Sequence, residues 1–268
     1  MKTIAIMRPE QHLKKSIELA KSHEYKVIAA PMVEIKERDA PEFDVFAHRV
    51  LGGEVDYVIF TSVNGVRFTL KKVGRLSSIC DITEFIDALN ACKTVAVGPS
   101  TQRGMEKHGI RVDVVPGAYS SEGIISALAP YIRGKKVEIV RSSHGAPLLV
   151  DGLKKHGAII HEVKVYDIVR PVGKCQRKLI EAALNDEIDV YAFTSAMSVK
   201  NFLKTAEDLG KKGELVEGMK HRTVAAIGNP TAEALRENGI CVDVLPERFT
   251  FKCMLDALIR KTHGELKI

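Results

Sequence analysis

The sequence has no tryptophan, and aromatic residues make up only 6% of its 268 positions. Such a chain has little material for a surface on which nucleic-acid bases stack, and its Lys and Arg residues are scattered. No apolar stretch approaches the roughly 18 residues that a membrane span needs. The first residues, MKTIAIMRPEQ, turn polar too early for the apolar core of a signal peptide. We therefore expect a cytoplasmic protein that binds neither nucleic acid nor membrane.

Motifs for metals, disulfides and nucleotides are also missing. The five cysteines include no CxxC pair, and the nine histidines form no HExxH or HxH cluster. An odd cysteine count without paired spacing disfavours both a disulfide framework and a structural zinc site. Neither GxxxxGK[ST] nor GxGxxG occurs, so nucleotide binding has no motif support. We expect reduced thiols, and no motif supports a metal site or a nucleotide cofactor.

The composition is that of an ordinary globular protein. Apolar residues make up 45% of the chain and charged residues 28%. Its length is comfortable for two domains of ordinary size. Lys and Arg outnumber Asp and Glu by 40 to 34, and this excess of +6 weakly favours an anionic partner. A solvated basic surface explains the excess equally well.

One sequence pattern occurs twice. Residues 56–70, DYVIFTSVNGVRFTL, match residues 189–203, DVYAFTSAMSVKNFL, at six of fifteen positions and an offset of 133. Residues 98–116, GPSTQRGMEKHGIRVDVVP, match residues 228–246, GNPTAEALRENGICVDVLP, at eight of nineteen positions and an offset of 130. Self-similarity at a fixed offset indicates a duplicated structural unit.

The start of the chain has a fainter partner, since TIAIMRP at 3–9 resembles KVEIVRS at 136–142. The sequence is therefore roughly two copies, 1–133 and 134–268. The β-rich runs IAIM, KVIAAP, YVIFTS, TVAVG and VDVVP recur as VEIV, IIHEV, VYAFTS, TVAAIG and VDVLP, with helical periods between them. This alternation predicts an α/β fold of parallel sheets covered on both faces. Ligands bind such sheets beyond the carboxyl ends of the strands, so we expect the site in a cleft between two similar domains.

The FTS motif follows an expected strand in both copies and supplies Ser62 and Ser195. Either serine suits the N-cap of the next helix, because its oxygen accepts an otherwise unpaired N–H. The alternative is that the helix N-terminus offers its N–H groups to an anion. Presence in both copies favours the second interpretation only modestly, since duplication copies caps as well as sites.

The second repeated loop has the sequence Gly-Pro-Ser-Thr in one copy and Gly-Asn-Pro-Thr in the other. Gly98 and Gly228 allow a close turn at the strand end, and the proline that follows suits helix entry. Thr101 and Thr231 then either cap the helix or point into the cleft. A carboxylate suits this loop as well as a phosphate does.

Three further side chains lie near expected strand ends. Arg8 and Arg141 each follow a strand and precede a helix. Each either holds a carboxylate with two parallel hydrogen bonds or is an ordinary surface arginine. Tyr166 follows an apolar run in VKVYDIVRP. It is either a half-buried packing residue or a general acid of high pKa.

The sequence resembles the uroporphyrinogen-III synthase family in a set of motifs that spans nearly the whole chain. They are DYVIFTSVNGVRF, TVAVGPSTQRGMEKHGIRVDVVP with SSEGI after it, VRSSHGAPLLVDGLKKHGAIIHEVKVYDIVRP, and VAAIGNPTAEALRENGI. They occur in the order and at the spacing of the family. Each motif is weak alone, and the set is fairly specific.

The resemblance implies a fold that the duplication alone would misplace. A division near residue 133 is the natural one for two copies. In the family, one flavodoxin-like α/β domain is inserted in another, and a two-stranded β linker joins them as a hinge. This implies domain 1 at 1–36 plus 171–268 and domain 2 at 37–170. The connectors lie near 33–38 and 165–171.

The resemblance also implies the reaction. The family closes the linear tetrapyrrole hydroxymethylbilane into uroporphyrinogen III, with loss of water, inversion of the last pyrrole ring and no cofactor. Without the enzyme the chain closes to the symmetric isomer, so catalysis is largely a matter of positioning. The substrate carries eight carboxylates, which suits the charge of +6. From the family we also expect a monomer.

Site residues follow from the same motifs. Tyr166 matches the family's cleft tyrosine, which is proposed to assist loss of the hydroxyl. The expected substrate-binding residues, of which the two arginines rest only on their place in the repeat, are Arg8, Ser62, Gly98, Thr101, Arg141, Ser195, Gly228 and Thr231. A two-lobed protein that binds a small anionic ligand without chemistry remains the alternative, because the sequence contains no familiar catalytic constellation.

Overall fold

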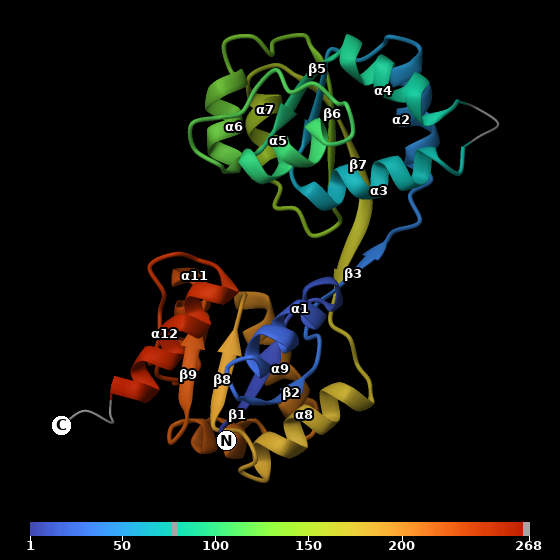
Figure 1. Cartoon of the computed structure of the whole chain (residues 1–268). Helices are drawn as coiled ribbons and strands as arrows, with labels where there is room; N and C mark the ends of the chain where they lie inside the picture. Colours follow the sequence, from blue (N-terminus) through green and yellow to red (C-terminus); the bar gives the residue numbers. More distant parts are fainter. Residues whose placement is uncertain (77–79, 265–268) are drawn as a thin grey trace. The chain divides into compact units, whose positions relative to one another are not determined.

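The computed structural model (Figure 1) describes residues 1–76 and 80–264. The chain divides into two compact units. Unit 1 consists of Met1–Glu34 and Val169–Ile268, and unit 2 is Ile35–Ile168. Both boundaries lie two residues before those implied by the resemblance. Among the described residues, no helix is long and apolar enough to cross a membrane.

Unit 1 contains a four-stranded parallel sheet. Its strands, in spatial order, are β2 (Lys26–Ala29), β1 (Thr3–Met7), β8 (Val190–Phe193) and β9 (Thr223–Ala226). Its helices are α1 (Glu10–Lys21), α8 (Lys174–Leu184), α9 (Ala196–Asp208), α10 (Lys212–Met219), α11 (Asn229–Arg236) and α12 (Phe251–Gly264). Successive side chains of a strand point to opposite faces. Ala5 and Met7 therefore pack in the core beneath α8 to α11, whereas Ile4 and Ile6 pack against α1 and α12.

Unit 2 contains a five-stranded sheet. Its strands, in spatial order, are β3 (Glu34–Glu37), β7 (Ile159–Val169), β6 (Lys136–Ser142), β4 (Tyr57–Phe60) and β5 (Lys93–Ala96). Its helices are α2 (Glu42–Leu51), α3 (Val63–Val73), α4 (Ile82–Ala91), α5 (Pro99–Glu106), α6 (Ser121–Leu128) and α7 (Leu148–Lys155). Val58 and Phe60 pack with α2 to α5, and Ile59 packs with α6 and α7. Both faces of the sheet are thus buried, as the apolar strands indicated.

Each sheet takes strands from both sequence copies. In unit 1, β1 of the first copy pairs with β8 of the second; in unit 2, β6 of the second copy pairs with β4 of the first. Equivalent aspartates hold the exchanged strands. Asp189 accepts a hydrogen bond from the Thr3 N–H at 2.7 Å, and Asp56 accepts one from the Lys136 N–H at 2.8 Å. A division at residue 133 would therefore cut through both sheets.

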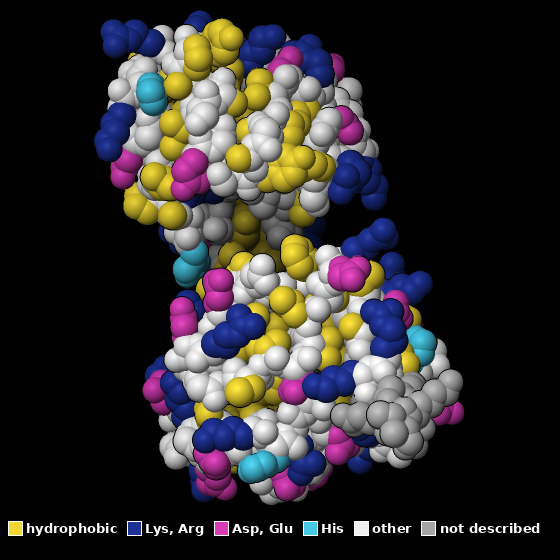
Figure 2. Space-filling view, turned by 90° about the vertical axis from the view of Figure 1, so that its left-hand side faces the viewer, with side chains coloured by type: hydrophobic (Ala, Val, Ile, Leu, Met, Phe, Trp, Pro, Cys, Tyr) yellow, Lys and Arg dark blue, Asp and Glu magenta, His cyan; other side chains and the backbone are white. Residues whose placement is uncertain are grey.

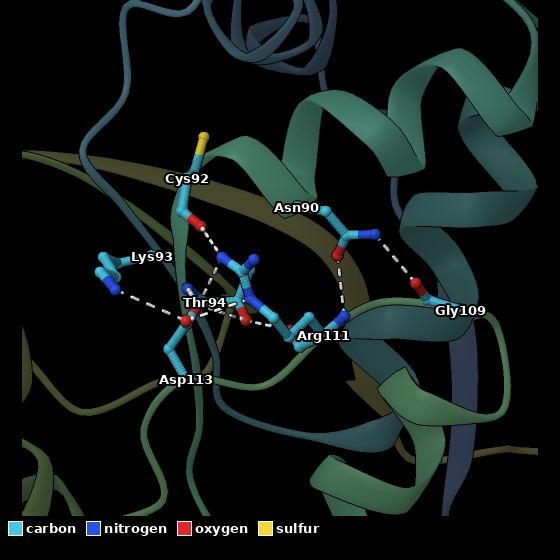
Figure 3. Close-up of polar contacts among 7 residues, drawn as sticks. All are labelled: Asn90, Cys92, Lys93, Thr94, Gly109, Arg111 and Asp113. Atoms are coloured by element: carbon cyan, nitrogen blue, oxygen red, sulfur yellow. Dashed lines mark hydrogen bonds and ion pairs between the residues drawn. The ribbon is translucent and has the colours of Figure 1, made fainter.

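The expected strands VDVVP and VDVLP form only isolated bridges, Val114 to Val95 and Val244 to Ala225. In unit 2 side chains hold this segment in place of a longer ladder (Figure 3). Asp113 accepts a hydrogen bond from the Thr94 N–H at 2.9 Å, and Asn90 accepts one from the Arg111 N–H at 2.8 Å. The Asn90 amide also donates to the Gly109 carbonyl at 3.0 Å.

Candidate active site

The two FTS serines are helix N-caps. Ser62 Oγ accepts a hydrogen bond from the Gly65 N–H at 3.0 Å and begins α3, and Ser195 Oγ accepts one from the Ser198 N–H at 3.0 Å and begins α9. Each serine has extended backbone angles, as an N-cap requires. The capping interpretation of the motif is therefore correct for both copies, and the caps place both hydroxyls at the carboxyl edge of a parallel sheet.

Tyr166 reaches one of these caps. It lies in the long strand β7, and its hydroxyl is 2.8 Å from Ser62 Oγ. Its ring stacks on Phe68 of α3 with a centroid distance of 5.8 Å, and the side chain is only 5% exposed. The pairing of β6 with β7 shifts register between Arg141 and Ser142, so Ser142 lies opposite Tyr166. Such a shift re-aims side chains at a strand end.

The glycine-threonine loops begin α5 and α11. Gly98 and Gly228 are the N-caps, so neither threonine is the cap residue. A glycine has no side chain to accept the first N–H groups, which leaves more of them open to a ligand than at the serine-capped helices. Thr101 and Thr231 are both 3% exposed and thus almost buried in the first turn.

Two exposed aromatic side chains lie over these glycines, and the sequence reasoning missed them. Tyr119 and Phe249 are 64% and 65% exposed. A Cβ atom on Gly98 would come within 3.1 Å of the Tyr119 ring, and one on Gly228 within 3.3 Å of the Phe249 ring. The signal was available, since the two residues are equivalent at the offset of 130. Figure 2 shows that exposed hydrophobic side chains interrupt the charged surface of both units.

The two arginines contact residues of their own units. Arg8 donates to Ser16 Oγ at 2.8 Å and lies 5.1 Å from the centroid of the Phe251 ring. Burial lowers the pKa of Arg8. Arg141 is 5% exposed, donates to the Ala146 carbonyl at 2.6 Å and pairs with Glu162 at 3.4 Å. Arg8 follows β1 as expected, whereas Arg141 lies within β6 and not after it. A role for either arginine in binding stays a prediction.

The site residues thus form one set in each unit. In unit 2, Ser62 and Tyr166 are joined by a hydrogen bond, and Gly98 and Thr101 begin a neighbouring helix. Unit 1 has the equivalent serine cap and glycine-threonine turn. The position equivalent to Tyr166 at the offset of 133 is Val33. The two sets offer the same backbone donors, and one of them adds a phenol.

Comparison with known sequences places these features in one family. The family model described as uroporphyrinogen-III synthase HemD matches residues 14–256. A protein of Methanothermobacter thermautotrophicus whose name also carries the term uroporphyrinogen-III synthase is 34% identical over 259 residues, which are 95% of this chain and 96% of that protein. The uroporphyrinogen-III synthase of Chlorobaculum parvum is 26% identical over 253 residues, which are 93% of this chain and 94% of that protein.

Solved structures share the fold. A mutant uroporphyrinogen III synthase of Thermus thermophilus has a TM-score of 0.71 and 22% identity. The match covers 98% of this chain and 100% of that one. The uroporphyrinogen-III synthetase of Helicobacter pylori has a TM-score of 0.61 and 19% identity, covering 97% and 100%. At these identities the likeness concerns the fold, which is mixed α/β with parallel sheets.

Proposed function

Because the chain belongs to the uroporphyrinogen-III synthase family of cyclising lyases in tetrapyrrole biosynthesis, we propose that Tyr166 and the strand ends of its two sheets convert hydroxymethylbilane into uroporphyrinogen III. The observation that carries the residue assignment is the Tyr166 hydroxyl, held 2.8 Å from an N-cap serine at a sheet's carboxyl edge. A hydroxyl at this edge supports the proposal, because parallel α/β sheets bind ligands beyond the carboxyl ends of their strands.

Tyr166 acts as the general acid in this proposal. The bond between the terminal methylene carbon and its hydroxyl breaks, the electron pair stays on oxygen, and the phenol proton completes a water molecule. An azafulvenium cation and a phenolate remain, so charge balances. The substituted carbon of the last ring then attacks the methylene carbon of this cation to give a spiro intermediate, whose rearrangement inverts that ring. The proton that the last ring loses on final closure restores the phenol. Proton donation of this kind contributes about a hundredfold or more.

The remaining residues bind the eight carboxylates and the pyrrole rings. Uncapped N–H groups at the starts of α5 and α11 are suitable carboxylate donors. Thr101 and Thr231 belong to these first turns, and Ser195 begins α9. Arg8 and Arg141 stay in the proposal through their places directly after β1 and near the end of β6. Tyr119 and Phe249 also belong to the proposed site, because their exposed ring faces suit contact with the flat pyrrole rings of the substrate.

Finer features of the fold belong to the same proposal. Unit 1 has the order β2-β1-β8-β9 with Val244 beyond, which is the flavodoxin-like order 2-1-3-4-5. Unit 2 has the same order if β6 is counted as its first strand, with β3 as an additional strand beyond β7. The connectors near 33–38 and 165–171 contain β3 and the end of β7, which are neighbours in the sheet, and we propose that they form the two-stranded linker. We further propose a cytoplasmic monomer that works without a cofactor.

The test supplies hydroxymethylbilane to the purified protein, oxidises the products and separates the isomers by chromatography. We expect the type III isomer in excess over type I. A blank without protein gives the rate and isomer of spontaneous closure. If the protein and the blank both give only type I, the chain is a binding protein for an anionic ligand and the proposal fails.

A further inference from the structure

We propose that Ser62 acts through Tyr166, as the residue that positions its hydroxyl and donates a hydrogen bond to it, and does not itself bind substrate. This inference rests on the proposed function, because it assigns a partner to the proposed general acid. The sequence motif placed Ser62 among the substrate-binding residues. The contacts of its hydroxyl point elsewhere.

The hydrogen bonds of Ser62 leave it little to offer a substrate. A serine hydroxyl has one proton and two lone pairs. One lone pair accepts the Gly65 N–H at 3.0 Å, and the neighbouring oxygen, at 2.8 Å, belongs to Tyr166. When the Ser62 hydroxyl donates its hydrogen bond to the phenol oxygen, the hydroxyl proton of Tyr166 is free to point at the substrate. A series of hydrogen bonds then runs from the Gly65 N–H at the N-terminus of α3, through Ser62 and Tyr166, to the leaving hydroxyl of the substrate.

The same bond grows stronger as the reaction proceeds. When Tyr166 gives up its proton, its oxygen becomes a phenolate and the bond from Ser62 becomes charge-assisted, which is shorter and stronger than a neutral one. The bond therefore stabilises the state after proton transfer more than the state before it. Interactions of this kind raise kcat and leave KM unchanged.

The equivalent serine of unit 1 shows that N-capping and positioning of a phenol are separate roles. Ser195 makes the same N-cap bond at the same distance, 3.0 Å, yet the position equivalent to Tyr166 there is Val33, which has no hydroxyl. A cap alone therefore requires no phenol partner. In unit 2 the ring is fixed independently by its stack on Phe68 and its burial, so Ser62 orients only the hydroxyl.

The experiment is a double-mutant cycle on the full chain with the isomer assay as readout. We expect Ser62→Ala to lower kcat about tenfold with KM unchanged, the effect of losing one hydrogen bond to a developing charge. In a Tyr166→Phe background, Ser62→Ala should have no further effect on kcat. Ser62→Thr, which keeps the hydroxyl, should restore most of the activity. Ser62→Gly, which is a good N-cap residue without a hydroxyl, repeats the test if the alanine variant folds poorly.

Ser120 provides the matched control. It begins α6 and accepts a hydrogen bond from the N–H of Gly123, also a glycine three residues on, at 3.2 Å. Ser120→Ala removes the same kind of cap in the same unit, and we expect it to lower the melting temperature as Ser62→Ala does while kcat stays unchanged. An equal loss of kcat in both backgrounds, or a raised KM with kcat unchanged, overturns the inference and leaves the proposed function intact. If Tyr166→Phe itself retains full activity, the proposed acid is wrong.

Discussion

In Tyr166 the ring packs against its neighbours, and the hydroxyl is the part proposed to take part in the reaction. Tyr166→Phe keeps the ring that stacks on Phe68, so we expect the melting temperature to change little. Turnover should fall by about a hundredfold, in line with the loss of one proton donor. Measuring kcat with freshly formed hydroxymethylbilane, beside a thermal melt of the same preparation, checks both expectations. Wild-type turnover in the variant would remove Tyr166 from the mechanism.

Asp56 illustrates a residue whose charge supports the exchanged strand. The hydrogen bond from the Lys135 side chain, followed by that from the Lys136 N–H, holds the pKa of Asp56 below its ordinary value. The native carboxylate is thus favoured, and its stabilising effect is present above the ordinary pKa of about 3.9. The effect is lost as pH falls through the lowered native pKa.

Asp56→Asn should therefore lower the free energy of unfolding near neutral pH by about 1 kcal/mol, a small value because the side chain is 35% exposed. The difference from wild type should shrink as pH falls from about 4 through the lowered native pKa, below which Asp56 of the folded protein is also protonated. Urea titrations at a series of pH values measure it. A difference that does not depend on pH contradicts the assigned cause.

Tyr119 and Phe249 bury little surface, so they contribute little to the core. They are 64% and 65% exposed, and each lies against a glycine. We expect Tyr119→Ser and Phe249→Ser to raise KM several-fold, since each removes one ring face worth about 1 kcal/mol, with the melting temperature nearly unchanged. Steady-state kinetics give KM. Exposed Tyr131, which is 67% exposed, offers Tyr131→Ser as a control expected to leave KM unchanged.

The role of a single residue could be predicted from sequence only where it depends on residues close to it in the chain. The FTS pattern indicated a serine N-cap, and both caps are present, because capping depends on four consecutive residues. The bond between Ser62 and Tyr166 joins residues 104 positions apart and depends on a register shift in the sheet, so no local pattern contains it. The burial of Arg141 likewise depends on the fold of the loop that follows it.

Elements were predicted well where apolar runs are buried on both faces. IAIM, YVIFTS and TVAVG became β1, β4 and β5, and their repeats became β6, β8 and β9. VDVVP and VDVLP have the same apolar character but form single bridges at the sheet edges. β-propensity reflects a side chain's surroundings, and at these edges hydrogen bonds from backbone N–H groups to aspartates take the place of a longer ladder.

The entry to α6 provides a test at the scale of one element. A Cβ atom on Gly123 would come within 1.8 Å of the Ala118 carbonyl oxygen, whereas one on Gly117 has nothing within 4 Å. We expect Gly123→Ala to destabilise the protein by about 1–3 kcal/mol, because backbone must move to make room. Gly117→Ala is the matched control and should be neutral. Urea unfolding followed by circular dichroism suits a chain without tryptophan, and equal midpoints for the two variants contradict the expectation.

For the whole molecule, the duplication and the three-dimensional units do not coincide. The repeat divides the sequence near residue 133, yet the units divide at 34 and 168, which are 134 residues apart and thus nearly equivalent positions in the two copies. Each copy contributes its first two strands to one sheet and its later strands to the other. Periodicity reveals which segments are equivalent, but equivalent segments can exchange partners without changing the pattern.

This exchange predicts which half of the chain folds alone. Fragment 35–168 contains the sheet β3-β7-β6-β4-β5 except for Glu34 of β3 and Val169 of β7, and it contains both core clusters of that unit. Fragment 1–133 has almost the same length but separates β1 from β8 and β4 from β6. We expect 35–168 to be monomeric with a cooperative urea transition, and 1–133 to lack one.

Mixing 1–133 with 134–268 should restore cooperative unfolding, because together they supply every strand of both sheets. Circular dichroism and size-exclusion chromatography follow each fragment alone and the equimolar mixture. A cooperative, monomeric 1–133 would mean that β1 pairs with β4 in place of β6, since Asp56 can accept from Thr3 as it does from Lys136. The pairing of strands between the two copies would then occur only in the intact chain, and the prediction would be wrong.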